Sequence, residues 1–146
     1  WRHGQTDHNL VGRVQGQVDI PLNATGLAQA AAAARILASP RPDRIVSSPL
    51  SRARTTAQIL ADLTGLDIEV EADLIERSFG VWEGLDRAAM MDGWPEQYAV
   101  WRDGGQPEGV GVEPRIEVAR RVGTALERIP RGRGRGAWSS SPTAPL

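Results

Sequence analysis

The start of the chain places a histidine between an arginine and a glycine. Arg2, His3 and Gly4 follow the first residue directly, and His8 is the only other histidine in the chain. A neutral imidazole can attack a phosphorus atom while a neighbouring guanidinium holds the phosphoryl oxygens. These residue types at this spacing are compatible with phosphoryl transfer through His3, although an isolated Arg-His pair in a loop is more often structural. We interpret His8 as a surface residue of the same loop.

Two later segments carry further groups suited to that chemistry. Residues 47–54 contain Arg52, and residues 76–84 contain the carboxyl groups of Glu76 and Glu83. An arginine can hold two phosphoryl oxygens at once, and a carboxyl group can give a proton to a leaving alkoxide. In α/β proteins ligands gather at the carboxyl ends of strands, so we expect these segments to converge there with the first one.

The elements expected to position these groups alternate between helix and strand. After an initial loop, the sequence predicts a helix, a strand, a helix and a strand at residues 27–37, 44–48, 51–64 and 67–70. Thr25 can cap the first helix and Pro40 ends it, while Gly65 is suited to end the second. This order predicts an α/β fold, a three-layer sandwich with a mostly parallel central sheet flanked by helices.

The second half of the chain is expected to be helical and then irregular. Residues 86–108 are interpreted as a helical lid or insertion, and residues 113–129 as a helix that ends before Pro130. Its expected inner side consists of Ile116, Val118, Ala119, Val122 and Leu126. Residues 1–130 are predicted to form one partial domain. Residues 131–146 are predicted to be a disordered or aberrant tail, because the sequence of this tail shows neither helical nor strand periodicity.

Composition excludes several classes of protein. The formal net charge is −1, so no overall field favours nucleic acid or an anionic membrane. All 17 basic residues are arginine, for which GC-rich codon usage is a sufficient explanation. Cysteine is absent, which excludes disulfides, thiolate nucleophiles and zinc–thiolate sites. No apolar run reaches the length of a membrane span, and we expect a cytoplasmic protein.

Three blocks in this order resemble the signatures of a known family. They read R-H-G-x-T-x-x-N at residues 2–9, S-S-x-x-x-R-A-x-x-T-A at residues 47–57, and E-x-x-x-G-x-W-E-G at residues 76–84. They are similar to the blocks of the histidine phosphatase superfamily, in its phosphoglycerate mutase-like branch. A weaker similarity extends from Glu113 to Arg121. The resemblance implies a phosphoglycerate mutase-like fold, here incomplete, and a phosphohistidine mechanism.

The resemblance also implies roles for individual residues. The catalytic set is His3, Glu76, Arg2 and Arg52, and the phosphate-binding set is Gly4, Thr6, Asn9 and Gln15. His3 would carry the phosphoryl group, and the two arginines would clamp its oxygens.

The remaining roles concern the amides, the loop and the acid. Asn9 and Gln15 would donate amide hydrogens to the phosphoryl group, while Gly4 and Thr6 shape the loop. Glu76 would be the general acid, with Glu83 as the alternative. A general acid must be protonated part of the time near neutral pH, so we expect Glu76 to be buried.

The chain departs from the family pattern at both ends. Only Trp1 precedes Arg2, where family members have a buried apolar strand, and no histidine follows His8, where they have a second active-site histidine. We therefore expect a chain truncated at both ends. Loss of one such donor to the phosphoryl group typically lowers a rate by about two to three powers of ten. As a hypothesis, the tail after Pro130 is translated from GC-rich DNA in the wrong reading frame.

The predicted function is hydrolysis of small phosphorylated metabolites through a phosphohistidine, with no metal and no cofactor. A phosphoglycerate mutase-type transfer and a catalytically dead fragment that only binds anions are the alternatives. Nucleic-acid binding would rest on Arg131, Arg133 and Arg135 alone, without interleaved aromatic residues, and is not expected. The sequence leaves the individual substrate and the oligomeric state open.

Overall fold

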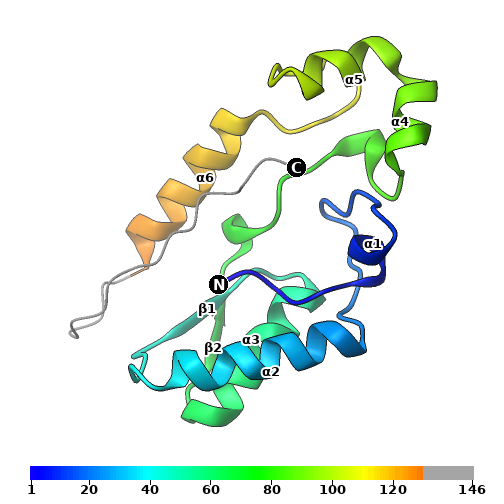
Figure 1. The fold of residues 1–146 in the computed structure, drawn as a ribbon. Coiled ribbons are helices and arrows are strands. Elements are labelled where there is room, and N and C mark those ends of the chain that lie inside the picture. Colours follow the sequence, from blue (N-terminus) through cyan, green and yellow to red (C-terminus); the bar gives the residue numbers. More distant parts are fainter. Residues whose placement is uncertain (130–146) are drawn as a thin grey trace.

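The computed structural model describes residues 1–129, so the predictions for the tail lie outside the described residues. The helices and strands follow in the order α1 (Asp7–Leu10), α2 (Ala24–Ala38), β1 (Ile45–Ser47), α3 (Ser51–Thr64), β2 (Ile68–Val70), α4 (Arg87–Gly93), α5 (Pro95–Arg102) and α6 (Arg115–Arg128). Two short 3₁₀ helices, η1 (Ala72–Leu74) and η2 (Gly80–Trp82), lie between β2 and α4. Figure 1 shows this arrangement.

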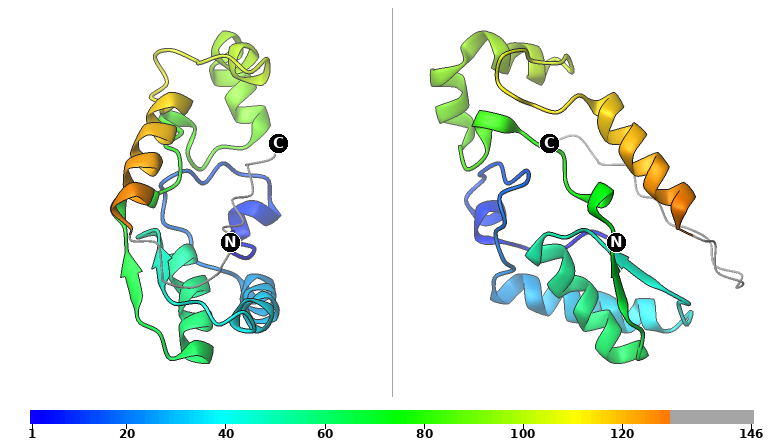
Figure 2. Two further views of the ribbon diagram at one scale, coloured as in Figure 1. Left: turned by 90° about the vertical axis from the view of Figure 1, so that its left-hand side faces the viewer. Right: turned by 180° about the vertical axis from the view of Figure 1, so that it is seen from behind.

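The predicted strands form a small parallel sheet. β1 pairs with β2 in a register that sets Ile45 opposite Ile68 and Ser47 opposite Val70. α3 connects the two strands and packs on both of them, and α2 packs against α3. Figure 2 shows the strands, α3 and α2 following one another across this part of the molecule. The α/β class with a parallel sheet is therefore confirmed.

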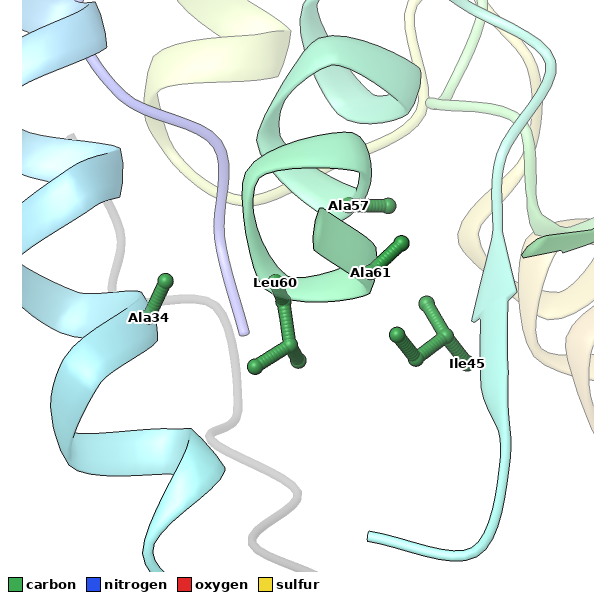
Figure 3. Packing of buried hydrophobic residues seen from close by; sticks show 5 residues of the cluster. All are labelled: Ala34, Ile45, Ala57, Leu60 and Ala61. Carbon is green, nitrogen blue, oxygen red and sulfur yellow. The ribbon is translucent and has the colours of Figure 1, made fainter. Parts of the chain in front are cut away.

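A cluster of small and aliphatic side chains forms the core of this part, which we call the aliphatic region (residues 24–70). Its buried members are Ala34, Ile45, Ala57, Leu60 and Ala61. Figure 3 shows Leu60 and the two alanines of α3 between Ala34 of α2 and Ile45 of β1. Because alanine has a short side chain, the axes of α2 and α3 can approach closely and still leave few voids.

The first long helix begins differently from the prediction. Asn23, not Thr25, is its N-cap, and the Asn23 side chain accepts a hydrogen bond from the Gly26 amide at 2.9 Å. Thr25 lies inside the first turn and is exposed. The prediction was wrong by two residues because Asn23 and Thr25 are both good caps, and the path of the preceding loop decides between them.

The second long helix agrees with the prediction at both ends. α3 starts at Ser51 and ends at Gly65, whose φ of 72° is the left-handed conformation that glycine adopts at low cost. Its buried face includes Arg52 and Thr56 as well as apolar residues, while Leu63 near its end is 52% exposed.

A second core surrounds the helices that follow η2, and we call this part the aromatic region (residues 79–112). Its buried members are Trp82, Met90, Tyr98, Val110 and Val112, with Trp101 packed beside them. The rings of Trp82 and Trp101 meet edge to face, with centroids 5.9 Å apart. The helical character predicted for residues 86–108 is confirmed by α4 and α5, which this core anchors.

The last helix is present where it was expected, but its predicted inner side was wrong. Only Ala125 of α6 is buried, whereas Ile116 is 72% and Leu126 is 42% exposed. The helix is attached to the segment around η1 mainly by its arginines: Arg121 and Arg128 bond to residues 71–76. Polar contacts with a distant segment therefore orient the helix more than its apolar pattern does. Among residues 1–129, no helix has the length and apolarity needed to cross a bilayer.

Candidate active site

The candidate nucleophile is held in one tautomer by its own loop. His3 is half-buried, and its Nδ1 lies 2.7 Å from the Gly4 carbonyl oxygen. A carbonyl can only accept, so Nδ1 carries the hydrogen and Nε2 keeps its lone pair. Burial lowers the pKa of His3, and the charges of Arg52 and Arg2 lower it further, against the raising effects of the Gly4 bond and Glu76. The imidazole is thus favoured in the neutral form that a nucleophile requires.

A close contact between two glycines positions this loop against α2. A Cβ on Gly4 would lie 2.2 Å from the Gly26 carbonyl oxygen, and a Cβ on Gly26 would lie 2.0 Å from the Gln5 carbonyl oxygen. Neither position tolerates a side chain without a backbone shift. The segment that carries His3 is therefore seated directly on the first turn of α2, and the loop-shaping role expected of Gly4 stays a prediction.

Thr6, Asn9 and Gln15 form one hydrogen-bonded unit beside it. The Thr6 backbone amide donates to Asn9 Oδ1 at 3.0 Å and the Asn9 amide donates to Thr6 Oγ1 at 3.2 Å, which is a capping box for the short helix α1. Thr6 Oγ1 also lies 2.7 Å from Gln15 Oε1, and Thr6 is fully buried. These bonds use the amide oxygens of Asn9 and Gln15, so their nitrogens are the groups left to donate to a ligand.

Arg52 is a buried cation next to His3. It is 1% exposed, and its Nη1 and Nη2 donate to the carbonyl oxygens of Val18 at 2.8 Å and Gly16 at 2.7 Å. Its Nε is buried without a hydrogen-bond partner in the described residues. Burial lowers the pKa of Arg52, opposed by the charges of Glu76, Asp19 and Glu83. A guanidinium has five donors, so donors remain for an anion.

Arg2 and Glu76 complete the predicted cluster, and both are exposed. Both lie close enough for their charges to act on His3 and on Arg52. The Glu76 carboxylate accepts from the Arg77 backbone amide at 2.8 Å. The burial expected for Glu76 is therefore wrong: its side chain is exposed, whereas those of its neighbours Ile75 and Arg77 are half-buried.

The alternative acid, Glu83, is occupied by structural bonds. Its Oε1 accepts from the backbone amides of Gln17 at 3.0 Å and Phe79 at 2.9 Å. Gly16 lies so near that a Cβ there would come within 2.2 Å of the same oxygen, and its φ is +52°. Glu83 thus joins the loop after α1 to the turn before η2, and these bonds favour Glu76 over Glu83 as the proton donor.

Sequence reasoning missed the importance of one ion pair. Glu113 and Arg121 are bonded through two contacts, Nε to Oε1 at 2.8 Å and Nη2 to Oε2 at 2.9 Å, and both side chains are largely buried. Arg121 holds the pKa of Glu113 below its ordinary value. The weak similarity from Glu113 to Arg121 was the available signal. As for metals, residues 1–129 contain no group of three or more His, Asp or Glu side chains that could hold an ion.

Comparison with known proteins assigns the family. The model of the histidine phosphatase superfamily (branch 1) matches residues 1–138. The chain belongs to this superfamily. The resemblance of the three sequence blocks is thus confirmed, and the Arg2-His3-Gly4 segment lies within the matched range.

Individual members of the superfamily are similar over most of this chain. Glucosyl-3-phosphoglycerate phosphatase of Mycobacterium tuberculosis is 42% identical over 120 residues, which cover 82% of this chain and 54% of the relative. Phosphoserine phosphatase 1 of Hydrogenobacter thermophilus is 34% identical over 131 residues, with 88% and 61% covered.

A solved structure of a mycobacterial glucosyl-3-phosphoglycerate phosphatase in complex with VO3 superposes with a TM-score of 0.79. It is 41% identical, and the match covers 86% of this chain and 60% of that one. The incomplete phosphoglycerate mutase-like fold is confirmed, and the chain spans about half the length of the first of the curated relatives it matches.

Proposed function

We propose that this chain is a phosphatase that hydrolyses phosphate monoesters of small metabolites through a phosphohistidine at His3. The observation that carries the proposal is the state of the imidazole: its Nδ1–H is committed to the Gly4 carbonyl, and its pKa is lowered by burial and by two guanidinium groups. Nε2 is then a neutral nucleophile beside fixed positive charge, which is the combination that attack on an anionic ester requires.

In the first step Nε2 of His3 attacks the phosphorus atom in line with the leaving oxygen. The N–P bond forms as the P–O bond to the alcohol breaks, and the electron pair of that bond stays on the alkoxide. Glu76, protonated, gives its proton to this oxygen and becomes a carboxylate. Arg2 and the free donors of Arg52 hold the equatorial oxygens, together with the amide nitrogens of Asn9 and Gln15.

In the second step water attacks the phosphohistidine. Glu76, now a carboxylate, accepts a proton from the water as the O–P bond forms and the N–P bond breaks. Inorganic phosphate leaves, His3 is again neutral at Nε2, and Glu76 is again protonated. Each turnover consumes one ester and one water and needs no metal or cofactor.

The proposed substrate class is inferred from the charge of the site and from the named relatives. The proposed binding groups are guanidinium and amide side chains suited to one phosphoryl group, and Arg2 and Glu76 are exposed. The relatives described above are named as phosphatases of small phosphorylated compounds. Which metabolite this chain prefers is left to assay, and the cytoplasmic location expected from the sequence stays a prediction.

The test is to trap the intermediate on the full chain. The purified protein is mixed with a radiolabelled phosphate ester and quenched rapidly. We expect label that is labile in acid and stable in alkali, on the peptide that contains His3. In His3→Ala we expect no such label and a fall in turnover of about ten-thousand-fold or more.

The matched control is His8→Gln, which removes the only other histidine and should keep both label and turnover. Folded protein with neither label nor turnover would overturn the proposal in favour of a fragment that only binds anions. Label that passes to an added alcohol and not to water would overturn it in favour of a mutase-type transfer.

A further inference from the structure

One arginine of α6 gathers the backbone of the segment that carries Glu76. Arg121 Nη1 donates to the carbonyl oxygens of Asp73 at 2.7 Å and Ile75 at 2.6 Å, and its Nη2 lies 3.3 Å from the carbonyl oxygen of Glu76. Three carbonyls within four residues thus converge on one guanidinium. Its planar fork with five donors can hold several acceptors at once, which an ammonium group cannot do in the same geometry.

The guanidinium is itself held in place. Glu113 binds it through both carboxylate oxygens, and the side chains of Arg121 and Glu113 are only 13% and 19% exposed. A partly buried, two-contact pair of this kind is stronger and more rigid than an exposed ion pair. The Arg121 guanidinium therefore fixes the segment from Asp73 to Glu76 relative to α6.

Glu113 also fixes the chain on the other side of Glu76. Its carboxylate accepts from the Ser78 amide at 3.2 Å, its amide donates to the Ser78 carbonyl at 2.9 Å, and its carbonyl accepts from Arg77 Nε at 2.6 Å. The backbone is thereby held at Ile75 and Glu76 by Arg121 and at Ser78 by Glu113. The Glu76 carbonyl also accepts from Gln17 Nε2 at 3.1 Å. The Glu76 side chain is exposed, and within residues 1–129 its carboxylate accepts a hydrogen bond only from the Arg77 amide, so the backbone bonds determine where the carboxyl group lies.

We propose that Arg121 is a positioning residue that holds the general acid Glu76 in reach of the leaving oxygen. This inference rests on the proposed function, since it assigns a role in the proton transfer of that reaction. Within residues 1–129 Arg121 forms hydrogen bonds with Glu113, Asp73, Ile75 and Glu76 and none with His3. Its loss should impair proton donation to the leaving group and leave the attack of His3 largely intact.

The test compares two esters that differ in their need for an acid. Phenyl phosphate leaves as a strongly basic phenolate, whereas 2,4-dinitrophenyl phosphate leaves as a weakly basic anion that needs no proton. We expect Arg121→Gln to lower kcat/KM for phenyl phosphate by about 100-fold and kcat/KM for the dinitrophenyl ester by less than about 3-fold. The reference variant, Glu76→Gln, should show the same imbalance.

The matched control is Arg128→Gln, two turns further along α6. Arg128 bonds the carboxylates of Glu71 and Asp73 in the same segment but reaches no carbonyl near Glu76. It should keep the ratio of the two kcat/KM values. Arg121→Lys, which keeps the charge opposite Glu113, should restore part of the loss and stands in if Arg121→Gln does not fold.

Equal losses for both esters in folded Arg121 variants, or no loss for either, would overturn the inference. Failure of the proposed function gives a different result, because the unaltered chain would then turn over neither ester and His3 would take up no label.

Discussion

The aliphatic and aromatic regions bury different kinds of side chain, and they contribute different residues to the candidate site. The aliphatic region brings together small side chains such as Ala34, Ala57 and Ala61 under closely packed helices, whereas the aromatic region is centred on the fully buried Trp82 with Tyr98 and Trp101 around it. Figure 1 shows the first around α2 and α3 and the second around α4 and α5, with the N-terminal segment between them.

The site residues divide along the same line. Arg52 belongs to α3, and His3 lies on a loop seated against α2, so the proposed nucleophile and its buried cation are carried by the aliphatic region. Glu83, from the aromatic region, bonds to the loop after α1, and Glu76 lies on the connection between the regions. In the proposed mechanism, attack on phosphorus and proton donation would therefore depend on separate parts of the molecule.

The largest expected effect is loss of the aromatic core. Trp82→Ala should lower the free energy of unfolding by about 3–5 kcal/mol, because a fully buried ring is replaced by a cavity. If the two cores are separate, hydrogen exchange should accelerate in α4 and α5 while the amides of α3 stay protected. Exchange followed by mass spectrometry measures both.

The matched variant on the other side is Leu60→Ala, for which we expect a loss of about 2–4 kcal/mol. In this variant hydrogen exchange should accelerate in α2 and α3 while the amides of α4 and α5 stay protected. Uniform acceleration in both variants would show that the molecule unfolds as one unit and would break the comparison.

The next effect concerns the link between the aromatic region and the loop after α1, a loop that Arg52 of the aliphatic region also binds. Glu83→Ala leaves the backbone amides of Gln17 and Phe79 without their charged acceptor, and should lower the free energy of unfolding by about 1–3 kcal/mol. Urea denaturation followed by circular dichroism measures the change. Glu108→Ala, an exposed glutamate, should change it by no more than about 0.5 kcal/mol. Equal values for the two variants would show that Glu83 does not hold the loop after α1 to the aromatic region.

A smaller effect is expected at the start of α2, in the aliphatic region. Asn23→Ala removes the N-cap bond to Gly26 and should lower the free energy of unfolding by about 1 kcal/mol. Thr25→Ala, inside the first turn, should have little effect because alanine is the better helix former. The same urea titrations compare the two, and a larger loss for Thr25→Ala would restore the cap expected from the sequence.

The smallest effect is a shift of the pH profile. In the proposed mechanism neutral His3 is the reactive form, so kcat/KM should fall as the pH drops through the pKa of His3, which lies below the ordinary value of 6.5. Arg2→Gln removes a charge that lowers this pKa, so the acidic limb should move to higher pH. The shift is small because Arg2 is exposed and screened by solvent.

Arg13→Gln, in the loop after α1 and also exposed, serves as the control and should leave the acidic limb in place. The measurement is kcat/KM for one phosphate ester as a function of pH, in the unaltered chain and in both variants. A limb that stays put or moves to lower pH in Arg2→Gln would contradict the electrostatic account of His3.

What could be predicted was mainly local in the chain. The strand at Ile45–Ser47, the helix from Ser51 to Thr64 and its end at Gly65 depend on neighbouring residues whose spacing and backbone preferences are visible in the sequence. The three blocks likewise each lie within about ten residues, which is why they identified the family and the candidate residues around His3.

What could not be predicted depends on pairs far apart in the chain. The exposed side of α6 follows from the bonds of Arg121 to residues some 45 positions earlier, and the surface position of Glu76 follows from the same bonds. The hydrogen bond from the Gln17 amide to the Glu83 carboxylate joins residues 66 positions apart in the chain.

The sequence by itself determined the residue types, the local helices and strands, and the family to which they belong. Only the tertiary structure decided that His3 and Arg52 are carried by one region. It alone also decided that the Glu83 carboxylate accepts bonds from distant backbone amides and that Arg121 bonds to the backbone at Glu76. The physical reason is that a hydrogen bond requires its donor and acceptor atoms to lie about 3 Å apart. For residues far apart in the chain, this distance is set by the folded backbone and cannot be predicted from the local sequence pattern.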